Sequence, residues 1–351
     1  MQTFALTPGR INKFKGQILK HAVPREVLSK GGRQVPMPKN NSDTYVARRW
    51  LPYGATTANP NQFFQNGAGD RGNAMTQAHL TQEGVTPNPE SIVPQDITVV
   101  VQQYSCLYGF TDKTYDLYED DIPKAMIEQV GERVTLVNEM IVYGALKGCT
   151  NQYYAGTGTS RSTVNGSLTL GLVRKVTKGL QANHGEFVTS VLAASPKYET
   201  SAVPAGYLVY CHTDMEPDIR DLPGFVPAEK YASGTPMDNE LGKVERFRFI
   251  TSPDLPSFQD AGAAVGSLGL YSTSGSNIDV YPFIVTAANA WSQIAVRGLD
   301  SLDPTYMAPA QKSKSDPFGQ RGYAGTIWWK AVMIENNGWM AVGNVGVKNL
   351  T

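Results

Sequence analysis

Residues 118–148, YEDDIPKAMIEQVGERVTLVNEMIVYGALKG, predict one long helix. Asp120 or Asp121 can cap its N-terminus, and Pro123 suits its first turn. Gly148 can end it. The predicted helix, 121–147, would be about 40 Å long, much longer than the usual helix of a globular domain. The apolar residues at helical spacing are Met126, Val130, Val134 (or Val137) and Ile141.

The segments around this helix mix both kinds of secondary structure. Residues 96–110, DITVVVQQYSCLYGF, are rich in Val, Ile and Tyr and predict a strand. Residues 168–185 predict a second helix, ending at 183–185. This mixture predicts an α+β fold. The further predicted elements are strands at 187–195, 206–212, 243–253 and 277–286 and a short helix at 214–225.

The charge of the chain is balanced in total but uneven along its length. The 351 residues have a net charge of zero. Residues 1–50 contain 10 Lys and Arg against Glu26 and Asp43, a balance of +8, so the rest of the chain carries −8. A basic head on an acidic body suits head-to-tail contact between copies. A solvated basic tail is the alternative, and the charges alone do not separate the two.

The three cysteines, Cys106, Cys149 and Cys211, are odd in number and widely spaced, which fits a reduced, cytoplasmic setting. No segment reaches the roughly 18 consecutive apolar residues of a membrane-spanning helix. Residues 1–21 also lack the apolar core and cleavage site of a secretory signal. We therefore expect a protein made in the cytoplasm, without a membrane partner.

The sequence GQRGYAG, residues 319–325, has glycines spaced like those of a phosphate-binding loop. They lead into TIWWKAVMI, a β-branched and aromatic run, and no Lys–Ser/Thr pair follows, so the turn opens a strand rather than a helix. We therefore expect no nucleotide site. The Asn-Gly of ENNGW predicts a hairpin turn, which would make residues 325–347 a two-stranded ribbon. Its aromatic residues, Trp328 and Trp339 among them, would need cover.

Reactive side chains are densest in CHTDMEPDIRD, residues 211–221. Cys211 and His212 are adjacent on a predicted strand and would point to opposite faces, which argues against a nucleophilic pair. We expect a strand end followed by a short helix capped by Asp214. The four histidines show no paired ligand spacing. We therefore expect no catalytic, cofactor-binding or metal-binding residues and no enzymatic activity.

Two segments near the N-terminus need an external surface. Residues 11–19, INKFKGQIL, place Ile11, Phe14 and Ile18 on one helical face, but this helix is too short to be stable alone. Residues 51–90 are rich in Gly, Asn, Gln, Thr and Pro and predict a long functional or mobile loop, which includes Phe63 and Phe64.

Charged residues offer further contact sites. The acidic run 111–121 includes Asp116, Glu119 and Asp120. Helix capping and exposure to solvent account for most of these acids. Alternatively, the run could bind the basic N-terminal arm of a neighbouring copy. Arg48 and Arg49 lack the basic surroundings of a nucleic-acid groove reader.

Four stretches together give a specific resemblance, and none is a catalytic signature. They are MPKNNSDTYVARRWLP at 37–52, LTQEGVTPNPESIVPQDITVVVQQYSCLYGFTDKTYDLYEDD at 80–121, GYLVYCHTDMEPDIRDLPGFVPAEKYASGTPMDNELGKVERFRFI at 206–250 and DPFGQRGYAGTIWWKAVMIENNGWMAV at 316–342. In these stretches and their spacing the chain resembles tailed-bacteriophage major capsid proteins of the Hong-Kong-phage fold. More narrowly, it resembles those of short-tailed phages related to coliphage N-four.

The resemblance implies a division of the chain. The expected parts are an N-terminal arm at 1–50, an extended loop at 51–110, a peripheral domain at 111–190 with a spine helix at 121–147, an axial domain at 191–320, and a C-terminal β-ribbon at 321–351 that joins the peripheral domain.

The resemblance also implies a function: self-assembly into hexamers and pentamers of an icosahedral shell around double-stranded DNA, in the virion and assembled in the host cytoplasm. Expected partners are other copies of the chain, a scaffolding protein, a portal protein, decoration proteins and DNA bound without sequence specificity. A nanocompartment shell protein of the same fold and a soluble α/β enzyme are the alternatives. The expected assembly contacts are Phe14, Ile18, Arg48, Arg49, Phe63, Phe64, Asp116, Glu119, Asp120, Trp328 and Trp339.

Overall fold

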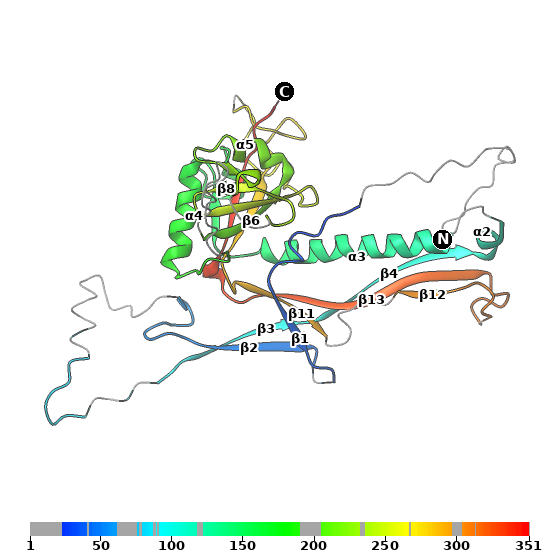
Figure 1. The fold of residues 1–351 in the computed structure, drawn as a ribbon, viewed down its shortest axis with the longest axis horizontal. Helices are drawn as coiled ribbons and strands as arrows, with labels where there is room; N and C mark the ends of the chain where they lie inside the picture. Colours follow the sequence, from blue (N-terminus) through cyan, green and yellow to red (C-terminus); the bar gives the residue numbers. More distant parts are fainter. Residues whose placement is uncertain are drawn as a thin grey trace.

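A computed structural model shows an elongated part and a compact part (Figure 1). The described residues are 23–40, 42–61, 76, 79–86, 89, 91–117, 122–189, 205–231, 236–266, 268–296, 304–312 and 314–350. The predicted helix at 11–19 and much of the predicted loop lie outside these ranges. Among the described residues, no helix combines the length and hydropathy that a membrane crossing requires.

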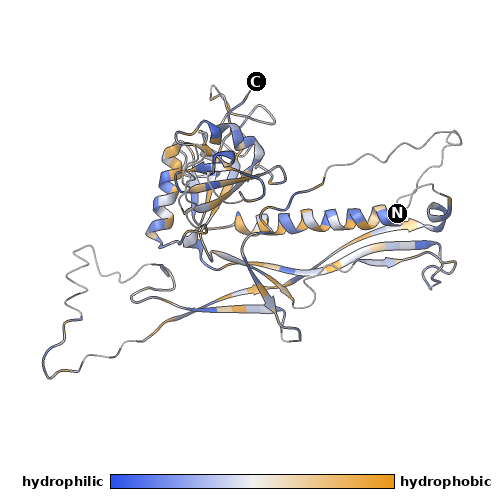
Figure 2. Cartoon of the chain, in the orientation of Figure 1, coloured by the Kyte–Doolittle hydropathy of each residue, from blue (hydrophilic) through white to orange (hydrophobic). Residues whose placement is uncertain are grey.

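The predicted long helix is confirmed as α3, Ile122–Leu146. It runs along one face of strands β4 (Gln102–Thr111) and β13 (Arg321–Ile334) in the elongated part (Figure 1). Hydrophobic and hydrophilic residues alternate along it (Figure 2). Met126, Val130 and Val134, which belong to the predicted apolar stripe, face the sheet. Farther along, Val142 and Leu146 are buried instead of Ile141, because this end of the helix packs against the compact part.

The elongated part is a five-stranded sheet with the order β1-β11-β13-β12, and β4 also pairs with β13. Its remaining strands are β1 (Arg33–Met37), β11 (Trp291–Val296) and β12 (Thr305–Met307). Helix α2, Asp112–Leu117, follows β4 directly at the far end. In the antiparallel β4–β13 pair, Tyr104 lies opposite Trp328 and both face α3.

A two-stranded ribbon extends from the elongated part. Strand β2 (Thr44–Trp50) pairs antiparallel with β3 (Pro94–Val100), and the inner face of the ribbon packs on Met37, Ile294 and Met333. The single strand predicted at 96–110 is therefore two strands. They separate at Val101, whose N–H donates to Asp43 O, because β3 and β4 pair with different partners.

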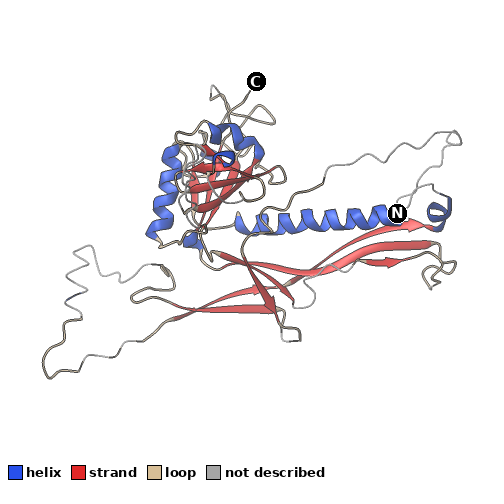
Figure 3. Cartoon of the chain, in the orientation of Figure 1, coloured by secondary structure: helices blue, strands red, loops and turns tan. Residues whose placement is uncertain are grey.

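The compact part contains a seven-stranded sheet with the order β5-β14-β10-β6-β9-β8-β7 and helices at its periphery (Figure 3). Its helices are α4 (Leu170–Ala182) and α5 (Glu216–Arg220). The strands are β5 (Gln152–Tyr154), β6 (Tyr207–His212), β7 (Val226–Pro227), β8 (Glu240–Val244), β9 (Phe247–Ser252), β10 (Tyr281–Thr286) and β14 (Met340–Val345).

The second predicted helix is confirmed as α4. Thr169 caps it by accepting the Leu172 N–H, and His184 at φ +57° follows its end. The Gly185 N–H then donates to Leu180 O, which satisfies a terminal carbonyl. The predicted strand at 243–253 is instead the hairpin of β8 and β9, with Glu245 at φ +49° in the turn.

The central strands of the compact part are buried on both faces because two different cores cover them. One face, with Val209 and Phe283, packs against α4. The other face, with Leu208 and Ile284, packs against the end of α3. The long helix is therefore shared by both parts.

The predicted C-terminal ribbon is wrong. Strands β13 and β14 do not pair: β13 belongs to the elongated sheet, and β14 lies between β5 and β10 in the compact sheet. Residues 335–339 are a crossing between the parts rather than a hairpin turn. Asn337–Trp339 form a 3-10 helix, in which the Asn336 side chain accepts the Gly338 N–H. A local Asn-Gly signal cannot reveal that the strands it joins have partners elsewhere.

The expected domain boundaries also differ from the packed parts. Helix α4 lies before residue 190 but packs in the compact core. Strands β11 and β12 lie within 191–320 but belong to the elongated sheet. The chain crosses between the parts several times, so contiguous segments do not describe them.

Candidate assembly surfaces

Trp328, expected to need cover from another copy, is covered by its own chain. Its indole Nε1 donates to Asn138 Oδ1 of α3 at 3.0 Å, and its ring stacks on Tyr104 with centroids 6.0 Å apart. Only 5% of its surface is exposed. Trp328 therefore joins the long helix to the sheet within one subunit.

Trp339 also has an internal position. It packs against both cores of the compact part, and its Nε1 donates to Asn183 O at 2.8 Å, at the end of α4. Asn183 and Asn336 both lie near Asn61 of the long loop, and Asn61 exchanges amide hydrogen bonds with Asn336. The crossing thus anchors the loop at Asn61.

Arg48 and Arg49 point to opposite faces of the ribbon. Arg48 makes two hydrogen bonds to the Asp96 carboxylate, at 2.7 and 2.8 Å, on the outer face. These bonds lower the pKa of Asp96 and raise that of Arg48. Arg49 donates to Gln95 Oε1 and to Glu335 O, and burial lowers its pKa. Arg49 therefore ties the ribbon to the crossing at 335–339.

Asp116 lies exposed on α2, at the far end of the elongated part. Apolar side chains share this end: Tyr115 and Leu117 on α2, and Phe318 just before β13, are exposed. We call these three residues the distal tip. The remaining expected contacts, Phe14, Ile18, Phe63, Phe64, Glu119 and Asp120, lie outside the described residues.

The outer face of the ribbon exposes apolar side chains on both strands. Val46, Trp50 and Val100 are each more than half exposed, and all lie on the face opposite the packed residues. An isolated two-stranded sheet is marginally stable in water. This outer ribbon face is therefore a candidate contact surface.

The elongated sheet has one covered and one open face. Cys106 and Trp328 face α3, so the alternation of each strand turns Leu107 and Ile327 away from it. Leu107 is 62% and Ile327 60% exposed. Met307, on the adjacent β12, lies opposite Tyr323 and is also exposed. Leu107, Ile327 and Met307 define the open sheet face.

The expected arm at 1–50 is only partly an arm, because residues 25–33, the N-terminal strap, pack on their own subunit. Leu28 is fully buried, and Val27 is nearly so. The strap is held by Glu139, which is 1% exposed in the second half of α3. Sequence reasoning missed Glu139 because an acid in a helix normally indicates a solvated face. The signal present in the sequence was the position of Glu139 among the apolar residues on one face of the helix.

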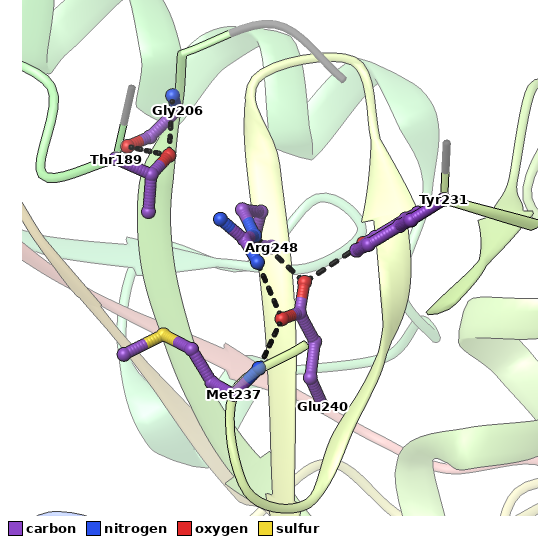
Figure 4. Close-up of polar contacts among 6 residues, drawn as sticks. All are labelled: Thr189, Gly206, Tyr231, Met237, Glu240 and Arg248. Atoms are coloured by element: carbon purple, nitrogen blue, oxygen red, sulfur yellow. Dashed lines mark hydrogen bonds and ion pairs between the residues drawn. The ribbon is translucent and has the colours of Figure 1, made fainter. Parts of the chain in front are cut away.

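A buried ion pair organises one end of the compact sheet (Figure 4). The Glu240 carboxylate accepts two hydrogen bonds from Arg248, at 2.7 and 2.6 Å, one from Tyr231 OH at 2.8 Å and one from the Met237 N–H at 2.9 Å. Both charges are thus paired and bonded, as buried charges require. Nearby, the Gly206 N–H donates to Thr189 Oγ1.

The segment around Cys211 is structural. Cys211 is fully buried, and burial raises the pKa of its thiol. His212 Nδ1 accepts the Asp214 N–H at 3.0 Å, so the predicted cap, Asp214, is wrong. The Asp214 carboxylate instead accepts from Tyr281 OH at 2.9 Å, since the Tyr281 strand lies beside β6. The described residues contain no cluster of His, Cys, Asp and Glu that could hold a metal ion.

Comparison with known proteins finds no matching family model. The chain is 21% identical over 341 residues to the major capsid protein of Pseudomonas phage KPP21, covering 87% of this chain and 85% of that protein. Among solved structures it is similar to the capsid of Ralstonia phage GP4, with a TM-score of 0.64 and 11% identity over all of both chains. It is also similar to the capsid of cyanophage Pam1, with a TM-score of 0.56 and 12% identity over 99% of this chain and all of that one.

These likenesses span both parts of the molecule, and they point to a structural rather than a catalytic protein. The chain has the α+β fold of phage major capsid proteins, and its role is that of a structural protein that forms a capsid.

Proposed function

We propose that copies of this chain form the hexamers and pentamers of an icosahedral shell that encloses double-stranded DNA. The observation that supports this most is the distribution of exposed apolar residues. Three groups of them form the outer ribbon face, the open sheet face and the distal tip, which belong to the elongated part or extend from it, and others, such as Met237 and Tyr271, lie on the compact part. Surfaces of this kind suit burial against neighbouring copies.

The energy of such contacts is sufficient for assembly when several form together. Burying apolar area contributes about 25 cal/mol per Å², and a specific interface buries roughly 1,000 Å² or more. Part of this gain offsets the entropy of association. A subunit with three separate surfaces engages several neighbours at once, so contacts that are individually modest hold a closed shell together.

Within this proposal the two parts take the roles known in the Hong-Kong-phage fold, and more narrowly in phages related to coliphage N-four. The elongated part would be the peripheral domain, with α3 as the spine helix. The compact part would be the axial domain, around the axis of each hexamer or pentamer. The segment between β2 and β3 would be the extended loop, and residues preceding the strap would be the arm.

Further partners follow from the same proposal. A scaffolding protein would guide closure in the host bacterial cytoplasm, a portal protein would occupy one vertex, and decoration proteins would bind outside. The packaged DNA would be held without sequence specificity. The net charge of zero supports this, because a strongly basic shell would retain the genome electrostatically.

The proposal is tested by expressing the full chain with the scaffolding protein of its genome and examining the product by negative-stain microscopy and size-exclusion chromatography. Closed particles of megadalton size are expected, and particles from infected cells should contain nuclease-resistant DNA. A small oligomer under all conditions would contradict shell formation. Particles filled with a cargo enzyme instead of DNA would indicate a nanocompartment shell.

A further inference from the structure

The N-terminal strap lies where the long helix, the elongated sheet and the compact part meet. On the helix side, the Glu139 carboxylate accepts three consecutive backbone N–H groups: Val27 at 3.2 Å, Leu28 at 2.8 Å and Ser29 at 2.9 Å. Hydrogen bonds to a buried carboxylate are among the stronger kinds. A single helical side chain therefore fixes three residues of the strap.

The elongated sheet holds the same residues from another side. Gln293 Nε2, on β11, donates to Ser29 O and Gly31 O, both at 2.7 Å. Gly32 has φ +73°, and a Cβ there would lie 2.7 Å from the Trp291 ring. The strap thus requires glycine to pass this ring, and its path is closely fitted.

The compact part provides the third attachment. Leu28 is buried with Leu208 and Ile250 of the compact sheet. Lys30 pairs with Asp238 at 3.0 Å, and the Arg25 N–H donates to Asp254 Oδ2 at 2.9 Å. The residue before Asp238, Met237, is itself held by Glu240 (Figure 4).

Beside the strap there is room for movement. A cleft of about 610 Å³, open to solvent, lies between it and the compact sheet, and its lining includes Val27, Gly31, Tyr210, Met237 and Trp291. The strap is therefore fastened by directed polar contacts on one side and bounded by open space on another.

We propose that the strap is a conformational joint, which sets the orientation of the compact part relative to α3 and the elongated sheet. Fastened by Glu139 and Gln293, it holds the two parts at one angle; released, it leaves the compact part attached through the core at the end of α3 and the chain crossings, and able to shift toward the adjacent cleft. Subunits of a closed shell with both hexamers and pentamers occupy unlike surroundings, so an adjustable angle would serve them. That use rests on the proposed function, whereas the joint itself does not.

The test uses the full-length unassembled chain with spin labels at Glu128→Cys on α3 and Lys175→Cys on α4. Both positions are exposed, while the three native cysteines are buried. In Glu139→Gln an amide N–H₂ replaces one of the two carboxylate oxygens. This group cannot accept a hydrogen bond from a strap N–H. We expect the amides of residues 27–29 to exchange with solvent at least tenfold faster, and the distribution of label distances to broaden.

Glu216→Gln, which alters a partly exposed carboxylate of α5 paired with Arg220, is the matched control and should change neither measurement. If Glu139→Gln prevents folding, Lys30→Met combined with Asp254→Asn removes two attachments of the strap to the compact part and should broaden the distance distribution without faster exchange in the strap. An unchanged distance distribution in the variant that folds would overturn the joint. Because no shell is needed, that result is distinct from a failure to assemble.

Discussion

Trp328 and Asn138, 190 residues apart in the chain, are joined by a hydrogen bond of 3.0 Å between the indole Nε1 and the amide Oδ1. It links the middle of β13 to α3, at a point where the sheet has a single covered face. Trp328, which the sequence predicts to need cover from a neighbour, is therefore part of the subunit's own core.

Trp328→Ala should consequently weaken the subunit itself. Removing a buried Trp costs about 3–5 kcal/mol of unfolding free energy, measured by urea denaturation. Trp328→Phe keeps an aromatic ring in the core but leaves part of the indole's space empty and Asn138 without its partner, so we expect a smaller loss of about 1–3 kcal/mol. Trp50→Ala, at a 62% exposed position, is the control and should cost about 0.5 kcal/mol or less. Equal stability of Trp328→Ala and wild type would contradict this role.

The open sheet face should affect assembly more than stability. Leu107→Asp and Ile327→Asp place charges where apolar contact is proposed, so we expect at least tenfold fewer particles in co-expression with the scaffolding protein. The unfolding free energy of the subunit should fall by about 1 kcal/mol or less, because the strand preferences of different residues span only about that range. Lys175→Asp, exposed on α4, is the control for added negative charge. Normal particle yield from both variants would exclude this face from assembly.

The buried pair of Glu240 and Arg248 should be sensitive to the loss of either member. Glu240→Leu or Arg248→Met alone leaves a buried charge without its partner and should cost about 3–5 kcal/mol. The double variant Glu240→Leu/Arg248→Met should be more stable than at least one single variant, because no unpaired charge remains. Thermal and urea unfolding of the four proteins measure this. Strictly additive losses would show that the two side chains do not act as a pair.

Lys330 should make stability depend on pH. Burial lowers its pKa to about 8 from the ordinary 10.5, although Glu26 and Glu139 oppose the shift. Between these values the unfolded chain binds more protons than the folded one, so the unfolding free energy should rise with pH. The rise is at most about 3 kcal/mol. It should be present in wild type from pH 8 to 10 and absent in Lys330→Met; an identical rise in both would assign it to other groups.

The expectation that residues 1–50 form a basic arm is best tested by two deletions. Removing 1–40 also removes Leu28 from the core, so the subunit should lose stability. Removing 1–22 leaves every described contact in place and takes away four basic residues and no acid. If the arm lies on an acidic neighbour, particles of this shorter deletion should dissociate at lower salt than wild type. Unchanged salt resistance would favour a solvated tail.

Much of the local structure could be predicted because local signals decide it. The helical stripe of 122–146, the cap and glycine end of α4, and the β-branched strands each depend on residues a few positions apart. Glu139 and the crossing at 335–339 could not be found in this way. Their partners lie 110 residues or more away, and in most proteins an acid in a helix or an Asn-Gly pair is explained by its local surroundings.

By itself, the sequence determined that this is an α+β chain with one unusually long helix, and its four characteristic stretches indicated the capsid fold. Only the tertiary structure decided which apolar residues are buried within the subunit and which remain exposed. Trp328 is buried and Ile327 beside it is exposed, since adjacent residues of a strand point to opposite faces and a helix covers only one of them. Which face that helix covers is set by packing between distant segments, which no short pattern encodes.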